Sequence, residues 1–191
     1  MHTAVISHLH QDHIGGLPEL GSSEIVISGQ EWDSLAGPRP QARGLMRSHI
    51  DLPGLRWNRV VPQNLADPGL RPFSLGHDLF GDGALVLLPT PDHTPGSLSM
   101  LVRRPGRPPL LMVGDLTYDD RLLIDGIVPG VGDKRQMHAT SALVNQLRTA
   151  LPGLVVLPAH DPTAAARLVA ALSDSPDLVA FPPTPPRTPA V

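Results

Sequence analysis

The segment Ser7-His8-Leu9-His10-Gln11-Asp12-His13 decides how this sequence is interpreted. It places three histidines and one aspartate within six residues, in the order HxHxDH. Neutral imidazoles and carboxylates are ligands that suit zinc and similar divalent ions. Because alternate side chains of an extended backbone share a face, His8 and His10 can bind one ion. Asp12 and His13 follow where the chain turns, and they can face a second ion nearby.

The residues on both sides of the motif support a binding loop. Ala4-Val5-Ile6-Ser7 has the apolar character of a buried strand near its end. Gly15-Gly16 follows the motif and allows a tight turn. The motif is therefore expected on a loop at the carboxyl end of a strand, where layered α/β proteins often carry their sites.

Further ligands are needed, because HxHxDH cannot complete two coordination spheres. His93 lies between the apolar runs 84–88 and 98–102, so it is expected on a loop between strands. Asp115 follows the apolar run 110–113, and His160 follows the run 154–157. Asp92, beside His93, is not assigned as a ligand. Four predicted strand ends thus carry seven ligand-type side chains.

With these features, the chain resembles the metallo-β-lactamase superfamily from about Ala4 to about Leu172. The resemblance rests on the HxHxDH motif, on the order of the later ligand candidates, and on their positions at strand ends. It implies an α/β fold of the αββα sandwich type, with two divalent metal ions, expected to be Zn²⁺, at one edge of the two sheets. It further implies that one ion is held by His8, His10 and His93, that the other is held by Asp12, His13 and His160, and that Asp115 bridges them.

The resemblance also predicts strands that this sequence does not contain. Met1 stands only seven residues before His8, whereas the superfamily places several strands ahead of HxHxDH. We therefore expect a chain shortened at its N-terminus, with an incomplete first sheet. Because open strand edges favour aggregation or pairing, low solubility or weak activity is expected, and an upstream extension is expected to restore both.

Length and composition indicate one domain, residues 1–172, followed by a Pro-rich segment, residues 173–191. The net charge of −3 and the lack of a basic stripe argue against nucleic acid as a partner, so a small-molecule substrate is expected. No apolar run is long enough to cross a membrane and no signal peptide is visible, so a cytoplasmic location is expected. Because cysteine is absent, neither disulfides nor Cys metal ligands are available.

Hydrophobic periodicity and turn residues predict the remaining elements. Strands are expected at 4–7, 24–28, 78–80, 84–88, 98–102, 110–113 and 154–157, and helices at 30–35, 135–151 and 162–172. The segment 38–72 is rich in Pro and Arg, and it is interpreted as surface loop with one helix at 41–49. The alternative is an insertion that covers the site, as insertions often do in the superfamily that the chain resembles. The remaining histidines, expected to be surface or structural residues, are His2, His49, His77 and His138.

Tyr118 favours one chemistry among those that two metal ions support. Two divalent ions can lower the pKa of a water between them from 15.7 to about 7, which favours hydrolysis. Tyr118 lies three residues after Asp115, where a phenol can donate a hydrogen bond to a developing oxyanion. The chain resembles N-acyl-homoserine lactonases, which are quorum-quenching enzymes, in this Tyr and in His160-Asp161. That resemblance implies that a bridging hydroxide opens a lactone and that Asp12 passes a proton to the departing alkoxide.

Other functions stay open at this point. A thioester hydrolase of the glyoxalase II type shares the fold and most of the ligands, as does a β-lactamase-like hydrolase. The carboxylate at Asp115 disfavours the β-lactamase, because those enzymes generally lack a carboxylate there. A mononuclear iron dioxygenase that acts on persulfides shares much of the ligand set and belongs to another reaction class. An inactive remnant that only binds metal is the non-enzymatic alternative.

Overall fold

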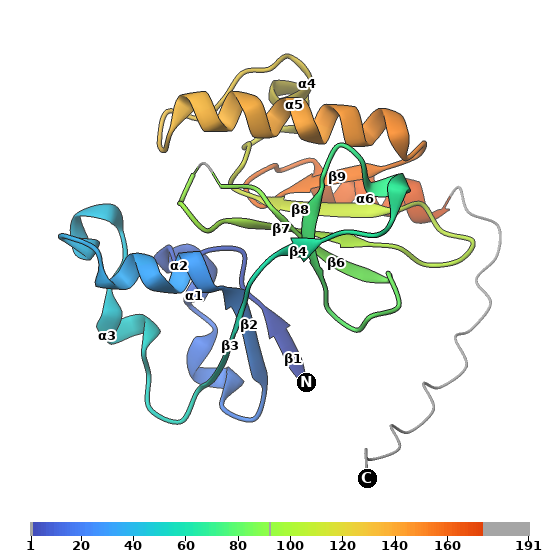
Figure 1. Ribbon diagram of the computed structural model, residues 1–191. Coiled ribbons are helices and arrows are strands. Elements are labelled where there is room, and N and C mark those ends of the chain that lie inside the picture. Colours follow the sequence, from blue (N-terminus) through green and yellow to red (C-terminus); the bar gives the residue numbers. More distant parts are fainter. Residues whose placement is uncertain (1, 92, 174–191) are drawn as a thin grey trace, which may run out of the picture.

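The computed structural model describes residues 2–91 and 93–173, and it arranges them around two β-sheets. The first sheet is parallel, in the order β1 (Thr3–Val5), β2 (Glu24–Ser28), β3 (Arg56–Val60). The second sheet follows sequence order: β4 (Gln63–Asn64), β5 (Leu75–Asp78), β6 (Leu85–Pro89), β7 (Leu98–Val102), β8 (Leu110–Gly114) and β9 (Val155–Pro158). The chain passes from one sheet to the other between β3 and β4 (Figure 1).

Helices cover the outer faces of both sheets. Beside the first sheet lie α1 (Gln11–Ile14), α2 (Gly29–Asp33) and α3 (Arg47–Ile50), and over the second lie α4 (Asp120–Ile124) and α5 (Lys134–Ala150), as Figure 1 shows. The last helix, α6 (Ala164–Ser173), packs beside β9. Short 3-10 helices are η1 (Leu17–Leu20), η2 (Ser34–Ala36), η3 (Pro40–Arg43) and η4 (Pro68–Leu70). The predicted αββα sandwich is confirmed.

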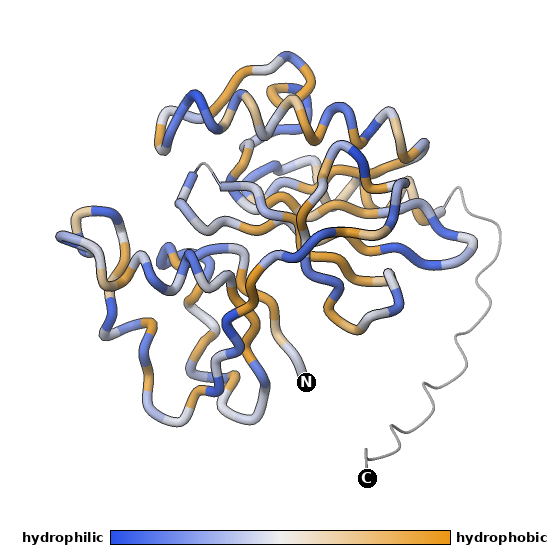
Figure 2. Tube along the Cα trace, in the orientation of Figure 1, coloured by the Kyte–Doolittle hydropathy of each residue, from blue (hydrophilic) through white to orange (hydrophobic). Residues whose placement is uncertain are grey.

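Strand alternation explains why the layers stack in this way. In β2, Ile25 and Ile27 pack with the helices, in a cluster that includes Leu9, Trp32 and Leu35. Val26, which points to the opposite face of the same strand, packs against the second sheet. Buried on both faces, β2 is a continuous apolar run, typical of a central parallel strand (Figure 2).

The second sheet repeats this arrangement. Leu87 of β6 faces the first sheet together with Val26, whereas Val86 and Leu88 face α5. In α5, Val144 and Leu147 are fully buried in that outer cluster, and Leu143 packs against it partly buried, as does Leu151 just after the helix. The predicted spacing of leucines therefore marks the face that α5 turns toward the sheet.

Three predicted features need correction. The segment 38–72 contains β3 and β4 rather than loop alone, and the helix expected at 41–49 is replaced by η3 and α3. Gly44 separates those two helices with a left-handed φ of 78°. Residues 79–80 lie in the hairpin turn after β5 and not in a strand. The sequence pattern also missed the short helix α4.

The two ends of the predicted domain are only partly covered by the structure. β1 is an edge strand of the three-stranded sheet, and the expectation of an incomplete first sheet stays a prediction. Of the predicted Pro-rich segment, the structure describes only Ser173, which ends α6. Within the described ranges, no helix combines the length and the apolar character that crossing a membrane requires.

Candidate metal centre

Strand directions bring the predicted ligands to one edge of the molecule. β6 and β8 are both antiparallel to β7, and β9 is parallel to β8, so the carboxyl ends of β6, β8 and β9 lie at the same edge of the sheet. His93, Asp115 and His160 follow these three strands. The loop after β1 reaches the same edge, where the Leu98 N–H donates to the Ser7 carbonyl at 3.0 Å.

Three histidines form the first ligand cluster. His8 Nε2 lies 3.2 Å from His10 Nδ1, and His10 Nδ1 lies 2.9 Å from His93 Nε2. His10, two residues after His8, has extended backbone angles just before α1, and His93 reaches both side chains from the second sheet. This cluster contains the residues predicted for one ion.

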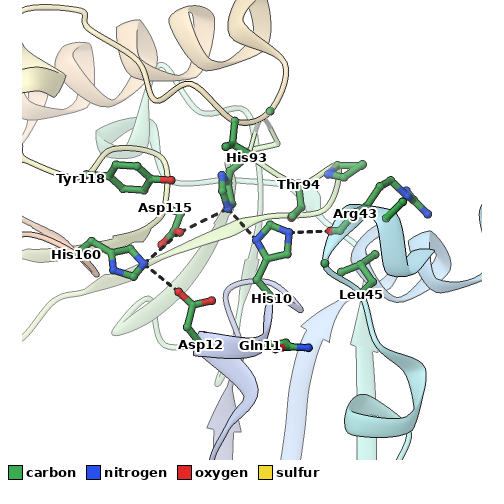
Figure 3. Close-up of a pocket in the computed structure, with 15 residues that line it drawn as sticks. His10, Gln11, Asp12, Arg43, Leu45, His93, Thr94, Asp115, Tyr118 and His160 are labelled. Atoms are coloured by element: carbon green, nitrogen blue, oxygen red, sulfur yellow. Dashed lines mark hydrogen bonds and ion pairs between the residues drawn. The ribbon is translucent and has the colours of Figure 1, made fainter. Parts of the chain in front are cut away.

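The second cluster stands beside the first and shares a neighbour with it. Asp115 Oδ2 lies 3.3 Å from His160 Nε2, and Asp115 Oδ1 lies 3.0 Å from His13 Nε2. Asp12 Oδ2 lies 3.2 Å from His160 Nε2 (Figure 3). The helical turn of α1 begins at Gln11, so the backbone at Asp12 and His13 no longer runs in the direction it has at His8 and His10. Asp115 Oδ2 is also 3.5 Å from His93 Nε2, which places this carboxylate between the clusters.

The spacing of these nitrogen and oxygen atoms suits binding to a shared divalent metal ion better than it suits direct contacts between the side chains. Zinc ligands 2.0–2.1 Å from a tetrahedral ion stand roughly 3.3 Å apart, and the nitrogen and oxygen atoms above have that spacing. His13 Nε2 and Asp115 Oδ1 are buried and close together, yet neither atom has a hydrogen-bond partner among the described residues. Such atoms are costly unless something else satisfies them. That the seven residues hold metal stays a prediction.

Burial and nearby charges shift the pKa values of the histidines in different directions. Burial, together with the charge of nearby His13, lowers the pKa of His8 to about 2. Burial also lowers the pKa of His93. Burial lowers the pKa of His13 as well, but the carboxylates of Asp115 and Asp12 outweigh burial and raise it above its ordinary value. His8 and His93 are therefore neutral imidazoles at physiological pH, the form that binds a metal ion.

The carboxylate between the clusters stays ionised. Burial alone would raise the pKa of Asp115, but His13, whose Nε2 stands 3.0 Å from Oδ1, together with His8 and His160, lowers it below its ordinary value. A buried carboxylate surrounded by imidazoles is thus available as an anionic ligand.

A neighbouring loop fixes the orientation of the His10 ring. His10 Nε2 lies 3.1 Å from the Arg43 carbonyl oxygen, so this nitrogen donates and leaves Nδ1 free to face His8 and His93. The Arg43 guanidinium donates to the Ser34 carbonyl at 2.6 Å, which holds η3 against η2. A Cβ at Gly44 would stand 3.0 Å from Cδ2 of His10, so glycine lets the loop approach the ring.

Gly44→Ala should displace His10 and weaken metal binding by the first cluster about 10-fold, the lower end of the range for residues that orient ligands. Gly54→Ala is the matched control, because Gly54 has a φ of 84° and nothing within 4 Å of the added Cβ. Both changes should destabilise the fold by about 1–2 kcal/mol through left-handed strain. Metal titration of the two variants distinguishes them, and an equal loss of metal affinity would contradict this role of Gly44.

Tyr118 lies beside the second cluster. Its ring stands edge-on to His160, with 5.5 Å between ring centroids, and its side chain is 37% exposed. Figure 3 shows its hydroxyl directed toward the space between His93 and Asp115. Burial and the charges of Asp115 and Asp12 raise the pKa of Tyr118, so the phenol keeps its proton at neutral pH and can donate a hydrogen bond.

Asp161 anchors the loop that carries His160. Its side chain is fully buried, and it accepts hydrogen bonds from Thr163, Arg167 and the Asp120 N–H. Burial would raise the pKa of Asp161, but these hydrogen bonds lower it far below its ordinary value. Because Asp120 begins α4, two residues after Tyr118, Asp161 ties the loops of Tyr118 and His160 together.

A cavity of about 1150 Å³ opens over both clusters. Its walls include the predicted ligands His10, Asp12, His93, Asp115 and His160, together with Tyr118 and the residues Ala42, Arg43, Leu45, Thr94, Pro95 and Val131. The interpretation of 38–72 as plain surface loop is therefore wrong for residues 42–45, which form one wall. The sequence left the alternative of a covering segment open but did not favour it, because a Pro- and Arg-rich segment carries no periodic signal of contact with a site.

Among the other side chains, His2, His49, His77 and His138 take no part in either cluster, as expected. His49 lines a smaller cavity with Gln11 and Leu52. Asp92 lies outside the described residues.

The sequence matches the metallo-beta-lactamase superfamily over residues 2–160. The chain belongs to this superfamily. Among the relatives of this superfamily member is the N-acyl homoserine lactonase AttM of Azorhizobium caulinodans, which is 32% identical over 163 residues, covering 84% of this chain and 58% of the relative. The chain thus spans somewhat more than half the length of that protein.

Solved structures of the superfamily share the fold. An N-acyl homoserine lactone hydrolase with the product N-hexanoyl-L-homoserine at its catalytic metal centre matches with a TM-score of 0.66 and 20% identity, over 85% of this chain and 56% of that one. AidC, a dizinc quorum-quenching lactonase in complex with a product, matches with a TM-score of 0.57 and 19% identity, over 85% of this chain and 58% of that one. At these identities the likeness concerns the fold.

Proposed function

We propose that this protein is a metal-dependent hydrolase that opens the ring of N-acyl-homoserine lactones. The observation that carries the proposal is the pair of ligand clusters that share Asp115, with the Tyr118 phenol beside them in one cavity. The 32% identical relative is an N-acyl homoserine lactonase, which supports the choice of lactones.

Two divalent ions, which we propose to be Zn²⁺, would be held by the ligand sets predicted from the sequence. His8, His10 and His93 would bind one ion, Asp12, His13 and His160 would bind the other, and Asp115 would contact both. When bound, such ions supply an ionised water at neutral pH and polarise a carbonyl oxygen. AidC, a structural neighbour described as a dizinc lactonase, supports zinc as the metal and two as the number of ions.

Tyr118 and Asp12 provide the groups that the ring opening needs. Hydrolysis adds water across the ester bond of the ring, and negative charge develops on the carbonyl oxygen. A protonated phenol directed into the cavity can donate a hydrogen bond to that oxygen. The ring oxygen leaves as an alkoxide and must take up a proton. Asp12 lines the cavity with a side chain that is 56% exposed. It is proposed to take up the proton that the attacking water gives up and to pass it to that alkoxide.

The apolar part of the cavity suits an acyl chain. Ala42 and Leu45 line it on the side of η3, and Pro95 and Val131 line it near His93. Pockets that bind small molecules are typically apolar with a few polar groups that orient the reacting end. The lactone ring would face the clusters, and the acyl chain would contact these side chains.

The experiment that tests the function is a substrate panel on zinc-loaded protein. The panel contains N-hexanoyl-L-homoserine lactone, a glutathione thioester, a β-lactam, and a persulfide supplied with oxygen and iron-loaded protein. Ring opening of the lactone at a higher kcat/KM than any other turnover is expected. Preferred cleavage of the thioester or the β-lactam would refute the lactonase, and oxygen consumption with persulfide would indicate a different reaction class.

Tyr118→Phe should lower kcat for lactone opening by up to about 10²–10³-fold, the usual effect of losing one oxyanion donor. The phenylalanine ring keeps the edge-on contact with His160, so metal content should not change. Elemental analysis beside steady-state kinetics separates the two effects. An unchanged kcat would reduce Tyr118 to a structural residue and remove one reason for choosing lactones.

A further inference from the structure

Glu31 is a fully buried carboxylate in α2, next to the first ligand cluster. Its exposed fraction is 0%. Oε1 accepts a hydrogen bond from the Leu9 N–H at 3.0 Å. Oε2 accepts from the Thr94 hydroxyl at 2.8 Å and from the Gly96 N–H at 3.0 Å. The two oxygens therefore bind two segments that are far apart in the sequence.

These two segments carry all three histidines of the first cluster. Leu9 lies between His8 and His10, and Thr94 follows His93. His8 and His10 come from the loop after the first sheet, whereas His93 comes from the loop after β6 in the second sheet. One side chain thus connects the backbones that must stay in register for His8, His10 and His93 to face one another.

The surroundings of Glu31 are specific for a carboxylate. Three donors point at it, and an ionised carboxylate accepts hydrogen bonds without donating any. No Arg, Lys or His among the described residues forms an ion pair with it, so these hydrogen bonds alone offset the cost of burying a charge. A Cβ at position 96 would stand 2.1 Å from the Glu31 backbone nitrogen, which shows how tightly the loop of His93 packs on α2.

We propose that Glu31 is a positioning residue for the first cluster, and that it sets the separation of the His8–His10 pair from His93. It touches neither the substrate cavity nor the ligand atoms, and it acts through the backbone of Leu9, Thr94 and Gly96. The proposal rests on the proposed metal site. The proposed effect is confined to one cluster: Glu31 controls the metal affinity of the first cluster and leaves that of the second cluster unchanged.

Glu31→Gln tests this with little change of volume. An amide has one oxygen and one NH2 group. In either orientation its NH2 group therefore faces another donor, the N–H of Leu9 or of Gly96, and cannot accept that hydrogen bond. Metal-free protein is titrated with Co²⁺ alone, and absorption of the bound cobalt reports the coordination of each site. The binding step that His93→Ala abolishes is assigned to the first cluster. In Glu31→Gln, that step should weaken about 10–100-fold with a changed cobalt spectrum, while the other step keeps its affinity.

Asp120→Asn is the matched control. Asp120 is a buried carboxylate whose Oδ1 accepts a hydrogen bond from Arg148 on α5, away from the loops of His8, His10 and His93. This variant should lose thermal stability without a change in the first-cluster step. An equal weakening of both steps in Glu31→Gln, or a first-cluster step as weak in Asp120→Asn, would show a general packing effect and overturn the proposal. Two unchanged steps in Glu31→Gln would also overturn it.

Thr94 supplies a second, milder test if Glu31→Gln does not fold. Thr94→Val removes the hydroxyl that donates to Glu31 and keeps the shape, whereas Thr94→Ser keeps the hydroxyl. A weaker first-cluster step in Thr94→Val with a normal step in Thr94→Ser supports the proposal, and no difference between them overturns it. Failure of the wild-type protein to bind metal would refute the proposed function instead, so the two failures are distinguishable.

Discussion

Asp115→Asn is expected to abolish metal binding at the second cluster and to lower lactone turnover more than any other single change. Asp115 contacts His13 and His160 through its two oxygens and lies 3.5 Å from His93 as well, so its charge serves both clusters. Losing a group that only orients a ligand costs about 10–100-fold in metal affinity or activity, and losing this ligand should cost more than 100-fold. Elemental analysis and kinetics on the same preparation measure both effects.

Asp119→Asn is the control for this change. Asp119 lies four residues later, and its carboxylate accepts the Arg121 N–H at the start of α4. Asparagine caps a helix about as well as aspartate, so this variant loses one negative charge near the site and little else. Similar losses in both variants would mean that the bridging carboxylate is misassigned.

Removal of metal is expected to abolish activity entirely, and addition of Zn²⁺ is expected to restore it. Acid should remove the two ions in sequence. The pKa of His13 is raised above its ordinary value, whereas the pKa of His8 is about 2 and that of His93 is lowered. As pH falls, a proton therefore competes for His13 before it competes for His8 or His93, and the second cluster should release its ion at a higher pH.

Dialysis at stepped pH, followed by measurement of metal per chain, checks this order. Two ions at neutral pH, one at an intermediate pH and none in stronger acid is the expected series. Simultaneous release, or activity that persists in chelator, would contradict the proposed pair of sites.

Local sequence was enough to predict where the ligand-type residues lie. Each follows an apolar strand. A polar residue that ends an apolar run marks the end of a buried strand, as at Asp115 and His160. The helix α5 was predictable for a similar reason, because its buried positions recur with helical spacing. The split into two clusters followed from the change from extended chain to helix within HxHxDH.

Features that depend on tertiary contacts were not predictable in this way. β3 is an edge strand with two arginines and one fully buried side chain, Val60, so its sequence lacks the alternation that marks a strand. Glu31 occupies an inward position of a helix, four residues before the buried Leu35, and only the placement of the loops of Leu9 and Thr94 explains a charge there. An acidic residue on the apolar face of a short helix was the one available signal.

The ligand clusters draw on both layers of the sandwich, since the loop after β1 belongs to the first sheet and His93, Asp115 and His160 belong to the second. An ion bound there would cross-link two halves of a protein that has no cysteine for a disulfide. At a free ion concentration 100 times its Kd, one such ion would add about 2.7 kcal/mol to the free energy of unfolding. The supply of metal would then govern the lifetime of the folded chain as well as its chemistry, and scarcity of zinc would lower the amount of protein along with its turnover.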